Sequence, residues 1–171
     1  PRGKAGQVAA LLVDSFPSTK VFFIYYPENL LATFSKYPMR LETVNAGISA
    51  QKILTHTPAG PLTIFNIHLL RTVLRRGDHW KRLHGRITRL VEKEVAGTEG
   101  PVIMGGDFNL TSMTQTYRQV GRSLKNAHWQ AGRGFGFTFP SQSRKLKGLV
   151  TLPPMIRIDH LFYNNALLAY N

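Results

Sequence analysis

Apolar residues occur along this chain in short runs, most of them bounded by Gly, Pro or Asn. Runs of β-branched and aromatic residues between turn-forming residues are typical of β-strands. The sequence therefore predicts strands over Val21–Tyr25, Leu30–Phe34, Arg40–Val44, Gln51–Thr57, Leu62–Leu69, Val102–Met104, Phe135–Phe139 and Ile156–Tyr163. The segments Arg40–Val44 and Gln51–Thr57 can pair as a hairpin across a turn at residues 45–47.

Other segments repeat their apolar positions with the spacing of a helix. A first helix is predicted around Val8–Leu12 and is stopped by Pro17, and a third over Ser112–Leu124. Asp78 can cap the second helix, whose apolar stripe comprises Trp80, Leu83, Ile87, Leu90, Val91 and Val95. Strands outnumber helices and both are mixed along the chain, which predicts an α/β or α+β arrangement of sheets covered by helices.

Composition narrows the class of protein. A chain of 171 residues that is 43% hydrophobic is long enough for one domain with a substantial core, and no boundary divides it into two. The absence of Cys excludes a disulfide scaffold, a thiolate metal site and a Cys nucleophile. Apolar runs such as Val21–Tyr26 are far too short to cross a bilayer.

The net charge is strongly positive, because 22 Lys and Arg face only 9 Asp and Glu, giving +13. The excess is uneven: residues 109–158 contain no carboxylate at all. Such a balance favours a polyanionic partner, either nucleic acid, an anionic membrane surface or a phosphorylated substrate. The alternative is a solvated basic surface that only keeps the protein soluble. Charge alone implies no reading of base sequence.

Candidate chemistry lies at the ends of predicted strands. Asp107 and Asn109 follow the apolar strand and two glycines, where a carboxylate and an amide can hold a hard cation and donate to phosphoryl oxygen. The alternative is plain turn chemistry. Alternation places Asn66 and His68 on one face of Leu62–Leu69, where they can share a polar site, although a lone strand histidine is more often structural.

The last predicted strand contains the remaining candidates. Alternation over Ile156–Tyr163 places Arg157 and Asp159 on one face and His160 on the other, so that Asp159 and His160 are not expected to act together. The alternative role of Asp159 is a surface ion pair with Arg157, which contributes little.

Five segments in chain order resemble motifs of the endonuclease/exonuclease/phosphatase family, whose fold is that of pancreatic deoxyribonuclease. Gly105–Asn109 resembles the family's GDFN motif, and Asn66–Leu69 resembles NTHL. The other three segments are Phe34–Met39, similar to SRYPI, Phe137–Pro140, similar to a TFP loop, and Arg157–His160, similar to RIDY or RIDH. The resemblance covers residues 8–163, and it implies a four-layered α/β sandwich of two packed, mostly antiparallel sheets flanked by helices.

The resemblance also implies an activity, a metal-dependent phosphoester hydrolysis by attack of water on phosphorus. Asp107 would lie beside the scissile phosphate and bind the metal or assist the leaving group, and Asn109 would donate to that phosphate. His68 would contact phosphate or act as a general acid, and Asp159 would orient the general-base histidine. The implied substrate-binding residues are Asn66, Thr138 and Arg157.

The implied cofactor is Mg²⁺ or Mn²⁺, and the implied partner is nucleic acid or another phosphoester, with a membrane surface as a further option and no obligate protein partner. A nuclease or related phosphodiesterase suits the charge. A phosphatase or lipid phosphodiesterase of the same fold and a non-catalytic polyanion-binding module are the alternatives. The family's early Asn, its metal-binding Glu and its final Ser-Asp-His have no counterpart here. We therefore expect residues 1–171 to form a partial domain, incomplete at both ends and inactive by itself.

Overall fold

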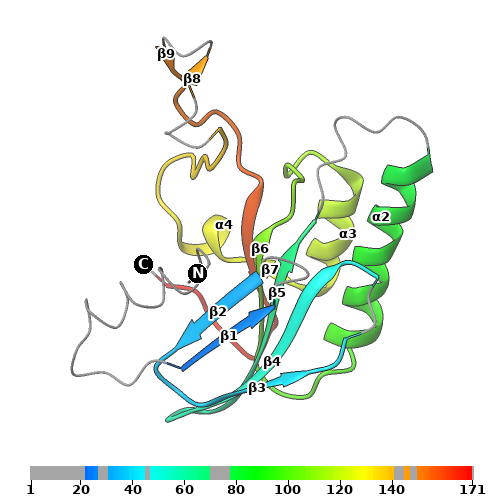
Figure 1. Ribbon diagram of the computed structural model, residues 1–171, viewed down its shortest axis with the longest axis vertical. Coiled ribbons are helices and arrows are strands. Elements are labelled where there is room, and N and C mark those ends of the chain that lie inside the picture. The colour runs from blue at the N-terminus through cyan, green and yellow to red at the C-terminus, as the bar shows by residue number, and fades with distance from the viewer. Residues whose placement is uncertain are drawn as a thin grey trace, which may run out of the picture.

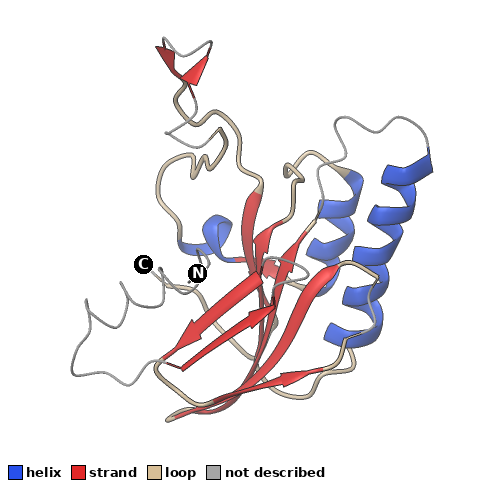
Figure 2. Ribbon diagram, viewed as in Figure 1, coloured by secondary structure: helices blue, strands red, loops and turns tan. Residues whose placement is uncertain are grey.

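A computed structural model of the chain describes residues 22–26, 31–44, 47–69, 78–140, 145–146 and 150–170 (Figure 2). The helix predicted around Val8–Leu12 lies outside these residues. No helix in the described ranges is both long and apolar enough to span a membrane.

The centre of the fold is a six-stranded sheet with strand order β3-β4-β5-β6-β10-β7 (Figure 1). Only β5 and β6 are parallel, and the other four neighbouring pairs are antiparallel. In chain order its strands are β3 (Met39–Glu42), β4 (Ser49–Thr57), β5 (Gly60–His68), β6 (Val102–Asp107), β7 (Lys125–Asn126) and β10 (Asp159–Tyr163). Two separate hairpins are β1 (Phe22–Tyr26) with β2 (Leu31–Ser35), and β8 (Lys145–Leu146) with β9 (Val150–Thr151).

Helices cover one face of this sheet (Figure 1). They are α2 (Asp78–Leu90), continued by a π-helical turn η2 (Val91–Val95), and α3 (Gln115–Ser123), while the short α4 (Ala127–Ala131) lies beside β10. Phe65 and Ile67 of β5 are buried on this face against Ile87 and Leu90 of α2 in one core cluster. Each such side chain stabilises the fold by about 1.5–3 kcal/mol on burial. The hairpin β1–β2 packs on the opposite face.

The prediction of a mixed α/β fold is confirmed, and the hairpin β3–β4 forms as expected. The strand predicted over Phe135–Phe139 is wrong: only Phe139 makes an isolated bridge, to Ile156. Gly134 and Gly136 have φ values of 66° and 59°, which are incompatible with extended backbone. The helix predicted from Ser112 begins later, at Gln115, because the Thr114 side chain caps it by accepting from Tyr117 N.

Candidate active site

Three candidate side chains lie at one level across three neighbouring strands. His68 ends β5 and is in register with Asp107, which ends β6, and Asp107 is opposite Asp159, which begins β10. Residues paired directly across strands point to the same face, with Cβ atoms about 4.5–5.5 Å apart in an antiparallel pair. The sheet therefore places His68, Asp107 and Asp159, which are far apart in sequence, at neighbouring strand ends. Their joint role in one site stays a prediction.

A glycine makes this close approach possible. Gly106 has a φ of 138°, and a Cβ built on it would lie only 2.0 Å from the Ile67 carbonyl oxygen. Any larger residue would push β6 away from β5 directly beside His68 and Asp107. The second glycine of the segment Gly105–Asn109 is thus a steric requirement of the site.

The loop after β6 is tied to the end of β5 by three hydrogen bonds. Leu69 N donates to the Asp107 carbonyl at 2.8 Å, and Asn109 Nδ2 donates to the Leu69 carbonyl at 2.6 Å. The Asn109 amide N–H donates to Asp107 Oδ1 at 2.8 Å. Asn109 adopts a φ of 47°, which Asn tolerates better than most residues. These contacts hold Asn109 beside Asp107, and its side chain retains a second N–H donor.

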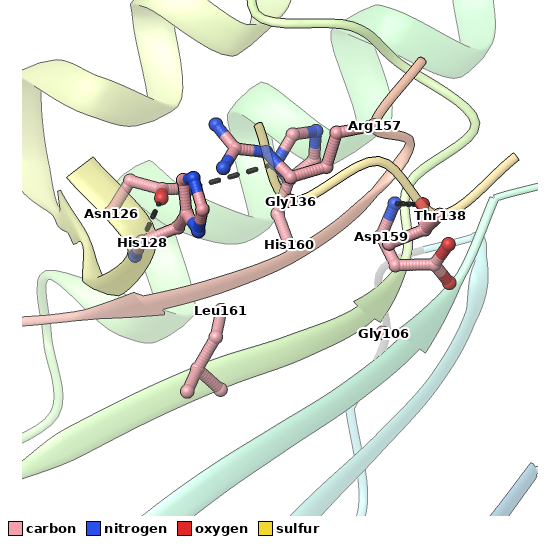
Figure 3. Close-up of a pocket in the computed structure, with 9 residues that line it drawn as sticks. All are labelled: Gly106, Asn126, His128, Gly136, Thr138, Arg157, Asp159, His160 and Leu161. Atoms are coloured by element: carbon pink, nitrogen blue, oxygen red, sulfur yellow. Dashed lines mark hydrogen bonds between the residues drawn. The ribbon is translucent and has the colours of Figure 1, made fainter. Parts of the chain in front are cut away.

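Thr138 fixes Asp159 from the other side. Its hydroxyl oxygen accepts from the backbone N–H group of Ile158 at 3.1 Å. It also accepts from the backbone N–H group of Asp159 at 3.2 Å (Figure 3). Phe108 N in turn donates to the Ile158 carbonyl at 3.0 Å, so that the loop after β6 and the start of β10 are also joined. Asp159 itself is exposed. Thr138 thus holds the backbone at the start of β10 in place. A contact between Thr138 and substrate stays a prediction.

Asn66 shares the face of His68, as alternation predicted, but its amide is used within the protein. Asn66 Nδ2 lies 3.0 Å from the Ala32 carbonyl, 2.9 Å from Thr33 Oγ1 and 3.2 Å from Gln51 Oε1. These acceptors hold β2 against the sheet. A contact between Asn66 and substrate stays a prediction.

Arg157 does not point where the sequence predicted. The strand begins only at Asp159, so alternation does not extend back to Arg157, and the guanidinium packs over the Trp129 ring with Cζ 4.6 Å from its centroid. Figure 3 shows it beside His160, while the Asp159 carboxylate points away from it. The described ion pairs involve Arg40, Lys52, Glu42 and Glu94, so the Arg157–Asp159 pair, the alternative role for Asp159, is absent among them.

His160 lies on the buried face of β10 and is structural. Its Nε2 is 2.7 Å from the Leu110 carbonyl, and its Nδ1 is 3.5 Å from Asn126 Nδ2. Burial, followed by the nearby positive charge of Arg157, lowers the pKa of His160 below its ordinary value. Because the Leu110 carbonyl can only accept, Nε2 is the donor in this contact. His160 is buried and Asp159 is exposed, which agrees with their predicted positions on opposite faces of the strand.

A pocket of about 370 Å³ opens along the edge of β10. Besides Thr138, Arg157 and Asp159, its lining includes Asn126 and His128, two residues that sequence reasoning missed. Asn126 accepts from His128 N at 3.0 Å and so caps α4. An Asn before an apolar segment is a readable cap signal, but no periodic pattern marks His128 as facing this pocket.

A sequence model described as the Endonuclease/Exonuclease/phosphatase family matches residues 5–171. The chain belongs to this family. A search of curated proteins found no significant match.

Solved structures support the same fold. The chain resembles an endonuclease/exonuclease/phosphatase family protein from Leptotrichia buccalis, with TM-score 0.59 and 12% identity over 94% of this chain and 67% of that one. It resembles sphingomyelinase C from Streptomyces griseocarneus, with TM-score 0.62 and 16% identity over 81% and 53% of the two chains. A mutant beta toxin from Staphylococcus aureus with bound magnesium ions gives TM-score 0.59 and 15% identity over 81% and 53%. The chain thus spans about half to two thirds of these proteins.

The family implies a divalent metal, and the donor chemistry at the site fits one. Asp107 and Asp159 supply two carboxylates at adjacent strand ends. Mg²⁺ commonly takes one or two protein carboxylates and keeps water or substrate oxygens as its other ligands. Within the described ranges, no three His, Asp or Glu side chains form a cluster that could enclose an ion. Two carboxylates at neighbouring strand ends therefore fit a metal that keeps water or substrate oxygens as its other ligands.

Proposed function

We propose that this chain is part of a metal-dependent phosphodiesterase, most specifically a nuclease, in which water attacks phosphorus. The observation that supports this most directly is the alignment of His68, Asp107 and Asp159 at one level of three adjacent strands, with Asn109 tied beside them. Family membership agrees with phosphoester hydrolysis. The net charge of +13 favours a polyanionic substrate over a neutral or zwitterionic one.

Each residue has a role in this proposal. The remaining N–H of the Asn109 amide donates to a phosphoryl oxygen, and His68 contacts the phosphate or protonates the leaving group. Asp107 holds the metal, and Asp159 orients a histidine that removes a proton from the attacking water. That histidine is not His160, which faces the core. A divalent ion bound there would neutralise charge on the phosphoryl oxygens.

The proposal also covers the architecture of the domain to which this chain belongs. Residues 1–171 would be one partial domain of a four-layered sandwich, in which the face bearing His68 packs against a second sheet. The β1–β2 hairpin already lies on that face, and Asn66 joins it to the central sheet. This position would place the proposed site at the rim between two sheets.

The test is hydrolysis by the full-length protein in the presence of Mg²⁺. The substrates are a DNA oligonucleotide, an RNA oligonucleotide, bis(p-nitrophenyl) phosphate, a phosphomonoester and sphingomyelin vesicles. Asp107→Asn keeps the acceptor for Asn109 N but removes the charge, and we expect kcat/KM to fall by about 100-fold or more. The control is Glu99→Gln, an exposed carboxylate outside the site, which should leave the rate unchanged.

The pattern of substrates decides between functions. Cleavage of oligonucleotides supports the proposal, whereas selective hydrolysis of the phosphomonoester or of sphingomyelin would replace it by a phosphatase or a lipid phosphodiesterase. Binding of DNA without turnover of any substrate would indicate a non-catalytic polyanion-binding module. An Asp107→Asn protein with full activity would contradict the assignment of the site.

A further inference from the structure

Arg157 is half-buried, and two nitrogens of its guanidinium lack hydrogen-bond partners. Its Nε and Nη1 atoms are inaccessible to solvent and have no hydrogen-bond acceptor in the described structure. A buried donor without an acceptor is costly, and more so on a charged group. Stacking on Trp129 accounts for the plane of the guanidinium but satisfies none of its N–H donors, which lie in that plane. Among the residues that the structure describes, these two nitrogens of the cation therefore lack acceptors.

The pocket beside this guanidinium lies where the sheet leaves an edge open. β7 pairs with β10 only at Phe162 and Tyr163, so β7 leaves the edge of β10 uncovered from Asp159 to Leu161. Arg157 and Thr138 both line the resulting pocket (Figure 3). A planar guanidinium is well suited to a phosphate, which it can bind through two parallel hydrogen bonds. Because Nε and Nη1 are covered in this structure, the Arg157 side chain must shift to present them to an anion in the pocket.

The loop around the pocket is shaped to admit the ring of His128. A Cβ on Gly132 would lie 2.2 Å from His128 Nδ1, and a Cβ on Gly136 would lie 2.5 Å from His128 Cε1. His128 Nε2 is 3.2 Å from the Gly134 carbonyl, which fixes the ring. This part of the pocket wall, residues 126–136, contains no carboxylate.

We propose that this pocket binds a second phosphate of the substrate, the one next to the scissile phosphate in a polynucleotide. The inference rests on the proposed phosphodiesterase function, because Thr138 lines the pocket and also holds Asp159 of the proposed site. The Asp159 carboxylate points away from the guanidinium, so the anion would meet Arg157 without facing that negative charge (Figure 3).

The sign of the charge selects among phosphodiesters. A choline headgroup presents a cation next to its phosphate, and Arg157 would repel it. A polynucleotide presents another anion at this position. Exposed aromatic rings nearby also suit nucleotides: Trp129 is 61% exposed, and Phe135 and Phe137 are stacked with ring centroids 5.1 Å apart. Aromatic faces of this kind stack on bases of any sequence.

Two measurements on the full-length protein test the inference. The first is binding of inorganic phosphate without metal, followed by Trp129 fluorescence in a Trp80→Phe background. The second is turnover with Mg²⁺ of bis(p-nitrophenyl) phosphate, which has one phosphate, and of the dinucleotides pTpT and TpTp, which have two. Arg157→Gln is compared with Arg133→Gln, which removes the same charge from an exposed position on the neighbouring loop.

We expect Arg157→Gln to weaken phosphate binding about tenfold or more and to lower kcat/KM for at least one of the two dinucleotides by a similar factor. Turnover of the one-phosphate substrate should fall by a clearly smaller factor, and Arg133→Gln should have little effect on any of these values. Arg157→Lys keeps the charge but not the planar guanidinium, and it should bind phosphate with intermediate affinity. If Arg157→Gln fails to fold, Arg157→Lys is the variant to compare with the unmodified protein.

Other results would overturn the inference. Equal losses on all substrates would mean that Arg157 only supports the fold, and equal losses in both Arg→Gln variants would mean a general effect of charge. A loss on sphingomyelin vesicles without a loss on dinucleotides would exclude the nucleotide assignment. If no phosphodiester is hydrolysed, the proposed function fails, and unchanged phosphate binding in Arg157→Gln would separately reject the pocket.

Discussion

Gly106 offers the sharpest test of how the site is built. In Gly106→Ala the new methyl group would lie 2.0 Å from the Ile67 carbonyl oxygen, where an ordinary carbon–oxygen contact is about 3.3 Å or more. The backbones of β5 and β6 must therefore separate by roughly 1 Å. This separation occurs between the residues that precede His68 and Asp107, so the proposed site should be disturbed together with the fold.

The expected loss in the free energy of unfolding has two contributions. A non-glycine residue held at a φ of 138° costs about 1–3 kcal/mol. Overpacking of the contact with Ile67 costs about 1–3 kcal/mol more. The free energy of unfolding should thus fall by about 2–6 kcal/mol. At roughly 2–4 °C per kcal/mol for a chain of this size, Tm should fall by at least about 4 °C.

The assay is thermal unfolding followed by circular dichroism, with kcat/KM measured well below Tm. The matched control is Gly121→Ala within α3, where an added Cβ meets nothing within 4 Å. That change should be neutral or stabilising by up to about 1 kcal/mol, because Ala favours helix. If Gly106→Ala and Gly121→Ala had the same Tm and the same activity, the close approach of β5 and β6 would not be what positions the site.

Three further changes test other parts of the structure. Thr138→Val removes the acceptor of two backbone N–H groups and should lower the free energy of unfolding by about 1–3 kcal/mol. It should also slow turnover, because Asp159 is then held less firmly. Thr138→Ser keeps the hydroxyl and should retain both the stability, measured by unfolding, and the rate. Because burial lowers the pKa of His160, the unfolded state binds a proton at this residue more readily than the folded state does. The free energy of unfolding should therefore be constant above about pH 6.5 and decline as the pH falls below that value. Urea unfolding measured across this range should show a shallower decline in His160→Gln and an unchanged decline in the exposed control His56→Gln. Chelation by EDTA should abolish phosphodiester hydrolysis, with recovery on adding Mg²⁺ or Mn²⁺, and activity that persists in EDTA would contradict a metal-dependent reaction.

The sequence alone determined much of the local structure and the family. The alternation along Leu62–Leu69 correctly placed Asn66 and His68 on one face, and Phe65 and Ile67 on the other face are buried, because the period of a strand is fixed by its backbone. The apolar stripe of the second helix correctly gave Ile87, Leu90, Val91 and Val95 as buried. Motif order identified the family, since five short segments in sequence are far more specific than any one of them.

The tertiary structure decided which groups share a space. Alternation failed at Arg157 because pairing with β6 begins only at Asp159, and strand pairing is a contact between distant segments that no local pattern encodes. The same dependence on distant partners explains why Gly106 is required by Ile67 and why Asn66 is held by β2. It also explains why His128 and Trp129 became neighbours of Arg157. Periodicity determines the side of an element that a residue occupies, but only the packed sheet determines what faces it.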